Sequence, residues 1–402
     1  MWRDLGFITA ANVVYALMQW TTVVLIARFA GVEVQGHYSY VLAIATPLAM
    51  LSRLNLRAIL VTDHKNVFHF AEYAHARLLW SALGALPVPI IVYVSGAKEV
   101  SWLAAGVALM KYVEGLIEIA QGQMQRDRKV YRIFLSAAYR AVAAVGIFGI
   151  AVYNSLDVAL AAFATAIAWT IVAYKYEWTS VRTHLTISTK IFGPQMRSLS
   201  KQCLSMGVSM ALLSMFSYVP IYFLKIHATV AELGRYAAIN YLWMIGVFVA
   251  TSIIQALSPR LAAAYHEMPR QYMRLLLKTI LATSLAGIVL LLLVAYWGER
   301  FVVLLYGPAY AGMEDVIEMM ILGLLLSAGQ ALLGLNLTIA REFSRILSGN
   351  AAALICILAL SAWLVPEGGP LGAAQAFVLA LAVKFAASAI QVGILLRRKL
   401  QS

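Results

Sequence analysis

The stretch that decides the fold begins at Val100 and ends at Gln121, and it reads VSWLAAGVALMKYVEGLIEIAQ. An α-helix of about 20 predominantly apolar residues crosses a hydrocarbon core of about 30 Å. Comparable apolar runs recur along all 402 residues. The sequence therefore predicts an all-α, polytopic membrane protein with about twelve transmembrane helices: residues 5–27, 37–60, 78–95, 100–121, 133–153, 156–176, 203–224, 236–257, 279–297, 316–338, 346–365 and 371–396.

The composition excludes a soluble globular protein. Hydrophobic residues make up 62% of the chain and charged residues 12%, whereas a soluble domain has about 45–50% apolar and about 25% charged residues. Both cysteines, Cys203 and Cys356, lie in apolar surroundings, so we expect no disulfide framework. The sequence contains no Walker loop and no metal-binding signature such as HExxH. We therefore expect no cofactor, no bound metal and no ATP hydrolysis.

The basic residues indicate the orientation of the spans. When the predicted spans alternate from a cytoplasmic N-terminus, 23 of the 31 Lys and Arg residues fall on the cytoplasmic side or at the cytoplasmic end of a span, 5 on the opposite side and 3 deeper inside spans. Cytoplasmic loops of membrane proteins carry such an excess of positive charge. The net charge of +13 is therefore interpreted as a topology signal directed at anionic membrane lipids, with no nucleic-acid partner. We expect a multi-pass protein of the cell inner membrane with both termini in the cytoplasm.

Short matches between the two halves of the chain indicate an internal repeat of six spans, an arrangement found in many transporters. Each match links one span with the sixth span after it: Gly36–Ser39 with Gly234–Ala237, Arg128–Ile133 with Arg341–Ile346, and Ala162–Phe163 with Ala376–Phe377. We predict an N-terminal six-helix lobe at 1–178, a cytoplasmic inter-lobe linker at 179–202 and a C-terminal six-helix lobe at 203–402. A substrate would bind in the cleft between the lobes.

Charged side chains inside the spans require an explanation, because each costs roughly 2.5–3.5 kcal/mol at mid-span on insertion scales. Lys111, Glu114 and Glu118 fall within roughly 60° of one another on one helix face. Arg140 on the next, antiparallel span lies at about the depth of Glu114, so the two can pair. Lys384 lies near the middle of the last span, at about the depth of Lys111, and neither lysine has an obvious acidic partner at its depth.

These intramembrane charges allow two interpretations. In the functional one, Lys111, Arg140 and Lys384 line a polar cleft and bind an anionic ligand, while Glu114 or Glu118 takes part in ion coupling. In the structural one, the charges neutralise one another and hold the helices together. A paired arginine can still face a cavity, so the two interpretations are compatible.

Arg53 and Arg57 end the second span at its cytoplasmic face. They are either anchors that extend to the membrane surface or a substrate-binding entry site for a phosphate-bearing headgroup, to which arginine offers planar, bidentate donors. The sequence leaves both interpretations open.

Five segments carry a family resemblance: GVEVQGHYS at 31–39, PLAMLSRLNLRAILVTD at 47–63, LGRYA at 233–237, LYGPAY at 305–310 and GPLGAAQA at 369–376. They resemble landmarks of the bacterial polysaccharide (O-antigen type) flippases, a family of the multidrug/oligosaccharidyl-lipid/polysaccharide exporter superfamily. The resemblance covers nearly the full length of the chain.

The resemblance implies two pseudo-symmetric six-helix lobes in a V-shaped exporter fold. It also implies translocation of an undecaprenyl-diphosphate-linked oligosaccharide, such as an O-antigen repeat unit of lipopolysaccharide, across the inner membrane by alternating access. Members of this family commonly have a cation-lined cavity, for which Lys111, Arg140 and Lys384 are the candidates here. A polysaccharide polymerase is a further candidate partner. The Lys111, Glu114 and Glu118 face departs from a purely cationic cavity and leaves the coupling ion open.

Two alternatives remain at the level of sequence. One is a cation-coupled drug exporter of the same superfamily, which the basic intramembrane residues disfavour because many such drugs are cations. The other is a membrane enzyme acting on lipid-linked sugars. The predicted outer loops of this chain contain no DxD and no Ser/His/Asp arrangement, so we expect a transporter without catalytic residues.

Overall fold

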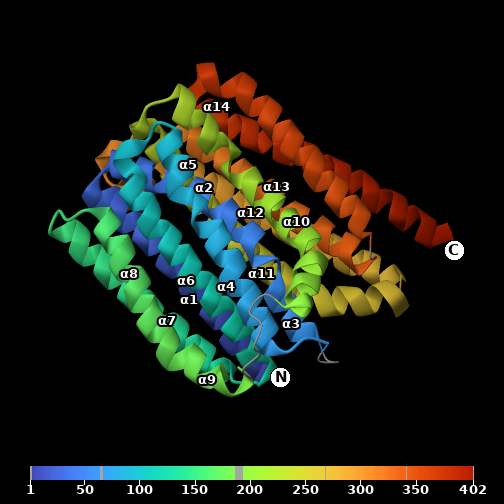
Figure 1. Cartoon of the computed structure of the whole chain (residues 1–402). Coiled ribbons are helices and arrows are strands. Elements are labelled where there is room, and N and C mark those ends of the chain that lie inside the picture. The colour runs from blue at the N-terminus through green and yellow to red at the C-terminus, as the bar shows by residue number, and fades with distance from the viewer. Residues whose placement is uncertain (1, 64–66, 186–192, 268, 341, 402) are drawn as a thin grey trace. The chain divides into compact units, whose positions relative to one another are not determined.

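The computed structural model describes residues 2–63, 67–185, 193–267, 269–340 and 342–401. These residues are helical almost throughout, and no strand occurs among them (Figure 1). Helices suit a hydrocarbon environment because every backbone hydrogen bond is satisfied within the segment. The chain divides into two compact units, Met1–Met215 (unit 1) and Phe216–Ser402 (unit 2).

Unit 1 consists of long helices joined by short turns. Its elements are α1 (Trp2–Leu25) with a π-helical turn (Ile26–Ala30), α2 (Val32–Arg53), α3 (Leu56–Thr62), α4 (Phe70–Ala85), α5 (Pro87–Val94), α6 (Ser101–Arg126), α7 (Val130–Tyr153), α8 (Val158–Ala173), a second π-helical turn (Tyr174–Trp178), α9 (Thr179–Val181) and the first part of α10 (Pro194–His227). Residues 186–192 of the predicted linker lie outside the described residues.

Unit 2 begins within α10 and continues with four more helices. These are α11 (Val230–Glu267), α12 (Pro269–Tyr306), α13 (Glu314–Ile339) and α14 (Phe343–Gln401). The helical geometry of α14 is interrupted at Gly369, where φ is 50° and ψ is −131°. Arg341, which we matched to Arg128 in the repeat, lies outside the described residues.

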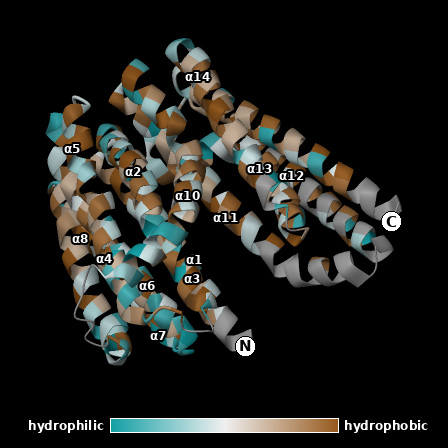
Figure 2. Cartoon of the chain, turned by 45° about the vertical axis from the view of Figure 1, so that its right-hand side comes forward, coloured by the Kyte–Doolittle hydropathy of each residue, from teal (hydrophilic) through white to brown (hydrophobic). Residues whose placement is uncertain are grey.

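The helices confirm the predicted polytopic fold. Among the described residues, nine helical stretches are long and apolar enough to cross a bilayer, and the bent pair within α12, whose halves meet at 69°, makes a tenth. One of the nine, Arg345–Leu395, contains the last two predicted spans on either side of Gly369. The 26-residue helix α6 is long enough but carries Lys111, Glu114 and Glu118. Counted in this way, the helices correspond to the twelve predicted spans. Figure 2 shows the apolar residues along the helices, with hydrophilic residues near the labels of α6 and α7.

The second predicted span, 37–60, is not one continuous helix. Leu54 and Asn55 both adopt left-handed backbone conformations, with φ of 50° and 53°, and separate α2 from α3. Asn tolerates this conformation and Leu does so only at a cost. The break separates Arg53, the last residue of α2, from Arg57 near the start of α3, so the two side chains lie on different helices.

The third span begins earlier than predicted, and this changes the place of one arginine. Helix α4 begins at Phe70, where His69 and Glu72 form a reciprocal capping box. Arg77, which precedes the predicted span 78–95 and was counted on its cytoplasmic side, therefore lies inside α4, and its side chain is fully buried. Proline interrupts this span, because α5 begins at Pro87.

Close approach of helices in unit 1 depends on small residues. Helix α6 packs against α2, α3, α4, α5 and α8. A Cβ atom on Gly115 of α6 would lie 2.5 Å from the Ser81 hydroxyl of α4, and one on Gly84 of α4 would lie 2.6 Å from Cβ of Ser52 on α2. Small residues at such contacts let membrane helices approach closely. They bring the polar face of α6 against α2, α3 and α4.

Candidate functional site

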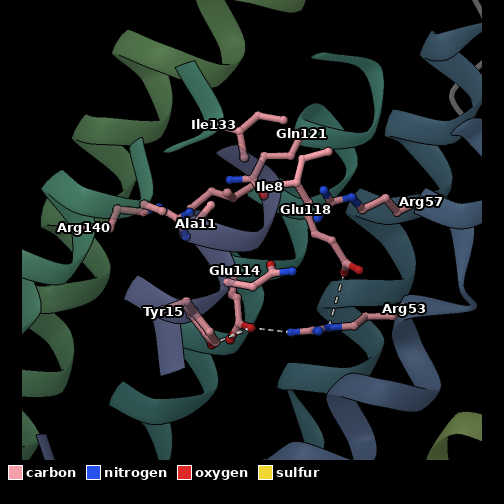
Figure 3. Close-up of a pocket in the computed structure, with 13 residues that line it drawn as sticks. Ile8, Ala11, Tyr15, Arg53, Arg57, Glu114, Glu118, Gln121, Ile133 and Arg140 are labelled. Atoms are coloured by element: carbon pink, nitrogen blue, oxygen red, sulfur yellow. Dashed lines mark hydrogen bonds and ion pairs between the residues drawn. The ribbon is translucent and has the colours of Figure 1, made fainter. Parts of the chain in front are cut away.

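A cavity of about 160 Å³ lies within unit 1, room for roughly five water molecules at their liquid volume. Residues of α1, α2, α3, α6 and α7 line it, and Figure 3 shows Arg53 and Arg57 extending from one side, Arg140 from the other, and the two glutamates between them. The lining residues are Ile8, Ala11, Asn12, Tyr15, Arg53, Arg57, Glu114, Ile117, Glu118, Gln121, Ile133, Ala137 and Arg140.

Glu114 is held by three short polar contacts. Its Oε1 lies 2.5 Å from Nη2 of Arg53 and accepts a hydrogen bond of 2.7 Å from the Tyr15 hydroxyl, which itself accepts one from Gln19. Its Oε2 accepts a hydrogen bond of 3.0 Å from Nζ of Lys111. The Glu114 side chain is 11% exposed. The two cations and the tyrosine hydroxyl therefore hold this carboxylate in one position.

Glu118, one helical turn further along α6, forms two long ion pairs among the described residues. Its Oε2 lies 3.4 Å from Nε of Arg53 and 3.5 Å from Nη2 of Arg77, and it makes no hydrogen bond. Charge-assisted hydrogen bonds usually measure about 2.7–2.9 Å. The Glu118 side chain is 24% exposed and faces the cavity, whereas Arg77 is fully buried behind it. Two guanidinium groups thus share one carboxylate.

Arg57 and Arg140 line the cavity without a carboxylate partner. Arg57 donates a hydrogen bond of 3.2 Å to the side-chain oxygen of Gln125, and Arg140 donates one of 3.3 Å to the Ser136 hydroxyl. The Arg140 guanidinium also lies over the Trp169 ring, 5.8 Å from its centroid. Neither arginine forms an ion pair within the described part of the chain. Their remaining N–H donors can bind the oxygens of a carboxylate or a phosphate group.

The structure brings five of the predicted site residues to one cavity: Arg53, Arg57, Glu114, Glu118 and Arg140. The predicted pair between Glu114 and Arg140 is wrong, because Glu114 pairs with Arg53 and Lys111. The expectation that Lys111 lacks an acidic partner is also wrong. Lys111 lies one turn before Glu114 on α6, and its flexible side chain reaches that carboxylate.

Lys384 belongs to unit 2, where the second part of α14 carries it. Its ammonium group lies over the ring of Phe216, 5.7 Å from the centroid, and it forms no ion pair among the described residues. Phe216 in turn packs against Phe377, which contacts Trp243. Lys384 is thus a partly buried cation beside an aromatic cluster.

Two members of the network, Tyr15 and Arg77, were missed at the sequence level. Asn12, Tyr15 and Gln19 recur at helical spacing on the first span, a polar face that indicates where α1 meets α6. The burial of Arg77 has no comparable signal in the sequence. Charged and histidine residues surround the start of its helix, so the sequence gives no sign that Arg77 alone is buried.

Two aspartates outside the membrane-spanning helices hold the loops that follow α3 and α6. Partial burial alone would raise the pKa of Asp63, but hydrogen bonds from the Val67 and Phe68 N–H groups hold it below its ordinary value. Burial alone would likewise raise the pKa of Asp127. Hydrogen bonds from Gln123 and His184 outweigh this effect, so that the pKa of Asp127 lies below its ordinary value. Both carboxylates remain ionised at neutral pH and tie the loops to the helix ends.

Comparison with known proteins gives one curated relative and several structures. No protein-family model matches the chain. Over 386 residues the chain is 24% identical to the capsular polysaccharide biosynthesis protein CapF of Staphylococcus aureus, a match that covers 93% of this chain and 94% of that protein.

The similar structures are transporters. An inward-facing multidrug resistance MATE family transporter of the MOP superfamily has a TM-score of 0.75 at 12% identity, with 98% of this chain and 99% of that chain covered. The lipid II flippase MurJ in an inward closed conformation has a TM-score of 0.73 at 11% identity, with 97% and 87% covered. A MOP superfamily transporter from Pyrococcus furiosus has a TM-score of 0.61 at 15% identity, with 99% and 93% covered. These likenesses confirm the exporter fold that the sequence predicted: the chain has the fold of the MOP superfamily of transporters, the multidrug/oligosaccharidyl-lipid/polysaccharide exporters.

Proposed function

We propose that this protein is a flippase that moves an undecaprenyl-diphosphate-linked oligosaccharide across the inner membrane, and that the cavity of unit 1 holds the diphosphate. The polyprenyl tail of such a lipid can remain in the bilayer during transport. Its diphosphate and sugars cannot cross hydrocarbon unaided, because charged groups are too costly to desolvate there. The protein therefore needs to supply a polar, basic path for the headgroup alone.

The observation that carries the proposal is the pair of arginines without carboxylate partners in the cavity. Arg57 from α3 and Arg140 from α7 face the same space and form no ion pair among the described residues. Arginine binds phosphate oxygens through parallel N–H donors. A dianionic group between α3 and α7 would balance these two charges.

The comparisons support the substrate class. One structure with the same fold is a lipid II flippase, and the curated relative bears the name of a capsular polysaccharide biosynthesis protein. An oligosaccharide carried on a polyprenyl diphosphate links these two descriptions. The proposed function also explains why the cavity carries more guanidinium groups than carboxylates.

In the proposed cycle, two six-helix lobes, 1–178 and 203–402, alternate access to a central path. Lys384 supplies a second cationic contact from the C-terminal lobe. Glu114 or Glu118 takes part in coupling to an ion gradient, for which the membrane potential supplies about 2.3 kcal/mol per charge per 100 mV. The protein resides in the inner membrane with cytoplasmic termini and passes its cargo to a polysaccharide polymerase.

Deleting the gene tests this function directly. The proposal predicts that lipid-linked repeat units accumulate in the inner leaflet and that surface polysaccharide is lost. Expression of the intact chain restores both, and expression of a Lys384→Ala variant at equal membrane abundance restores them poorly. Unchanged delivery of repeat units to the outer leaflet in the deletion strain contradicts the proposal.

Export of apolar drugs is the second candidate, and two observations favour it. One is the similarity to a multidrug MATE family transporter. The other is an apolar cavity of about 270 Å³ in unit 2, which Trp243, Phe301 and Met320 line. This function predicts that the deletion strain becomes more susceptible to apolar drugs while its lipid-linked repeat units are delivered normally. The flippase function predicts the opposite combination.

A further inference from the structure

The two acidic residues of the unit 1 cavity differ in how tightly they are held, although both lie on the same face of α6. Glu114 has three contacts of 3.0 Å or less, to Arg53, Tyr15 and Lys111. Oε2 of Glu118 has two ion-pair contacts, of 3.4 and 3.5 Å, and no hydrogen bond within the described part of the chain. Glu114 is therefore a fixed part of the site, while Glu118 lies midway between two cations and moves toward either at little cost.

The two cations that share Glu118 differ in burial. The Arg77 side chain has no exposed area, and Glu118 is the only carboxylate paired with it among the described residues. Arg53 is 19% exposed, lines the cavity and has Glu114 as a second partner. A buried charge that loses its partner is costly, whereas Arg53 keeps one carboxylate if Glu118 leaves. Glu118 therefore stays with Arg77 when another anion approaches Arg53.

We propose that Glu118 is an internal competitor of the anionic substrate: in the empty cavity it partly neutralises Arg53, and an incoming diphosphate displaces it from Arg53 onto the buried Arg77. This inference rests on the proposed function and adds the group that limits the affinity of the site. Release then requires no separate agent, because the returning carboxylate competes with the diphosphate for the same guanidinium. Arg77 is a positioning residue, since it does not line the cavity and acts through Glu118.

The charged groups facing Glu118 come from three neighbouring helices: Arg53 on α2, Arg57 on α3 and Arg77 on α4. Removing the negative charge of Glu118 frees Arg53 for the ligand. Removing the positive charge of Arg77 has the opposite effect, because Glu118 then pairs with Arg53 alone. The two substitutions are thus expected to change ligand affinity in opposite directions, although both remove a charge from the same ion pair.

Binding of inorganic pyrophosphate to the purified full-length chain in detergent tests the inference by titration calorimetry. Glu118→Gln is expected to bind pyrophosphate about tenfold more tightly than the unmodified chain, and Arg77→Gln about tenfold more weakly. Because Glu118→Gln leaves the buried Arg77 without its carboxylate partner, the double variant Glu118→Gln/Arg77→Gln is the second measurement. It is expected to bind as tightly as Glu118→Gln, since Arg77 has no role once Glu118 is neutral.

Arg57→Ala separates failure of this inference from failure of the proposed function. If Arg57→Ala abolishes binding but Glu118→Gln and the double variant bind no more tightly than the unmodified chain, the competitor role is overturned and the phosphate site stands. If the unmodified chain, Arg57→Ala and Glu118→Gln all fail to bind pyrophosphate, the proposed phosphate site is overturned as well. Equal weakening of affinity by Glu118→Gln and Arg77→Gln would show a structural role and overturn the inference.

Discussion

Replacing Glu114 with Gln keeps the shape of the side chain and removes the charge that Arg53 and Lys111 share. Both cations are largely buried, with side chains 19% and 12% exposed. Removing one partner of a buried ion pair costs about 3–5 kcal/mol. The amide oxygen of Gln still accepts the hydrogen bond from Tyr15, which is worth about 1 kcal/mol. We therefore expect Glu114→Gln to lower the free energy of unfolding by about 3 kcal/mol.

Thermal unfolding of the purified protein in detergent measures this loss. Glu33→Gln is the matched control, because Glu33 is exposed at the start of α2 and surface substitutions usually change stability by less than about 0.5 kcal/mol. Adding Lys111→Met to Glu114→Gln removes one unbalanced cation and should restore part of the loss. A Glu114→Gln variant that unfolds at the same midpoint as Glu33→Gln would refute this account of the ion-pair network.

Three further predictions concern the elements that shape the site. Gly84→Ala places a Cβ 2.6 Å from Cβ of Ser52, and such overpacking should cost about 1–3 kcal/mol; an unchanged thermal midpoint would contradict the close packing of α2 and α4. Asn55→Val puts a β-branched residue at φ 53° and should lower stability by about 1–2 kcal/mol, whereas Asn55→Gly should not. Asp127→Asn should destabilise the protein by about 1 kcal/mol at pH 7. The contacts of Asp127, among them the one to His184, lower its pKa, so its ionised form stabilises the fold above the ordinary pKa of 3.8. That difference should vanish as pH falls below 3.8 through the lowered pKa, and a constant difference across this range would exclude the carboxylate as its cause.

The sequence predicts the number of spans and the residues of the polar face because both depend on local patterns. Apolar runs of bilayer length fix the spans, and helical spacing places Lys111, Glu114 and Glu118 on one face. The structure bears out these inferences, since Glu114 and Glu118 line the cavity and Lys111 joins Glu114. The topology of the spans and the orientation of the termini remain predictions.

The partners of these charges could not be predicted, because they depend on which helices pack together. We paired Glu114 with Arg140 because they lie at the same membrane depth on consecutive spans. The structure instead packs α6 against α2 and α3, so that Arg53 reaches Glu114. The helix break at Leu54 and Asn55 and the burial of Arg77 also arise from tertiary packing. A polar residue in a span thus indicates that a site exists, but not which residues complete it.

The central claim, that the unit 1 cavity carries a lipid-linked diphosphate, is tested most directly by transport in proteoliposomes. The measurement is the rate at which reconstituted protein moves an undecaprenyl-diphosphate-linked oligosaccharide between leaflets, compared between the unmodified chain, Arg57→Ala, Arg140→Ala and the exposed-site control Arg132→Ala. The account predicts that Arg57→Ala and Arg140→Ala each lower the rate at least about tenfold with unchanged unfolding midpoints, while Arg132→Ala transports normally. Equal rates in all four proteins, or no translocation of this lipid by the unmodified chain, would contradict it.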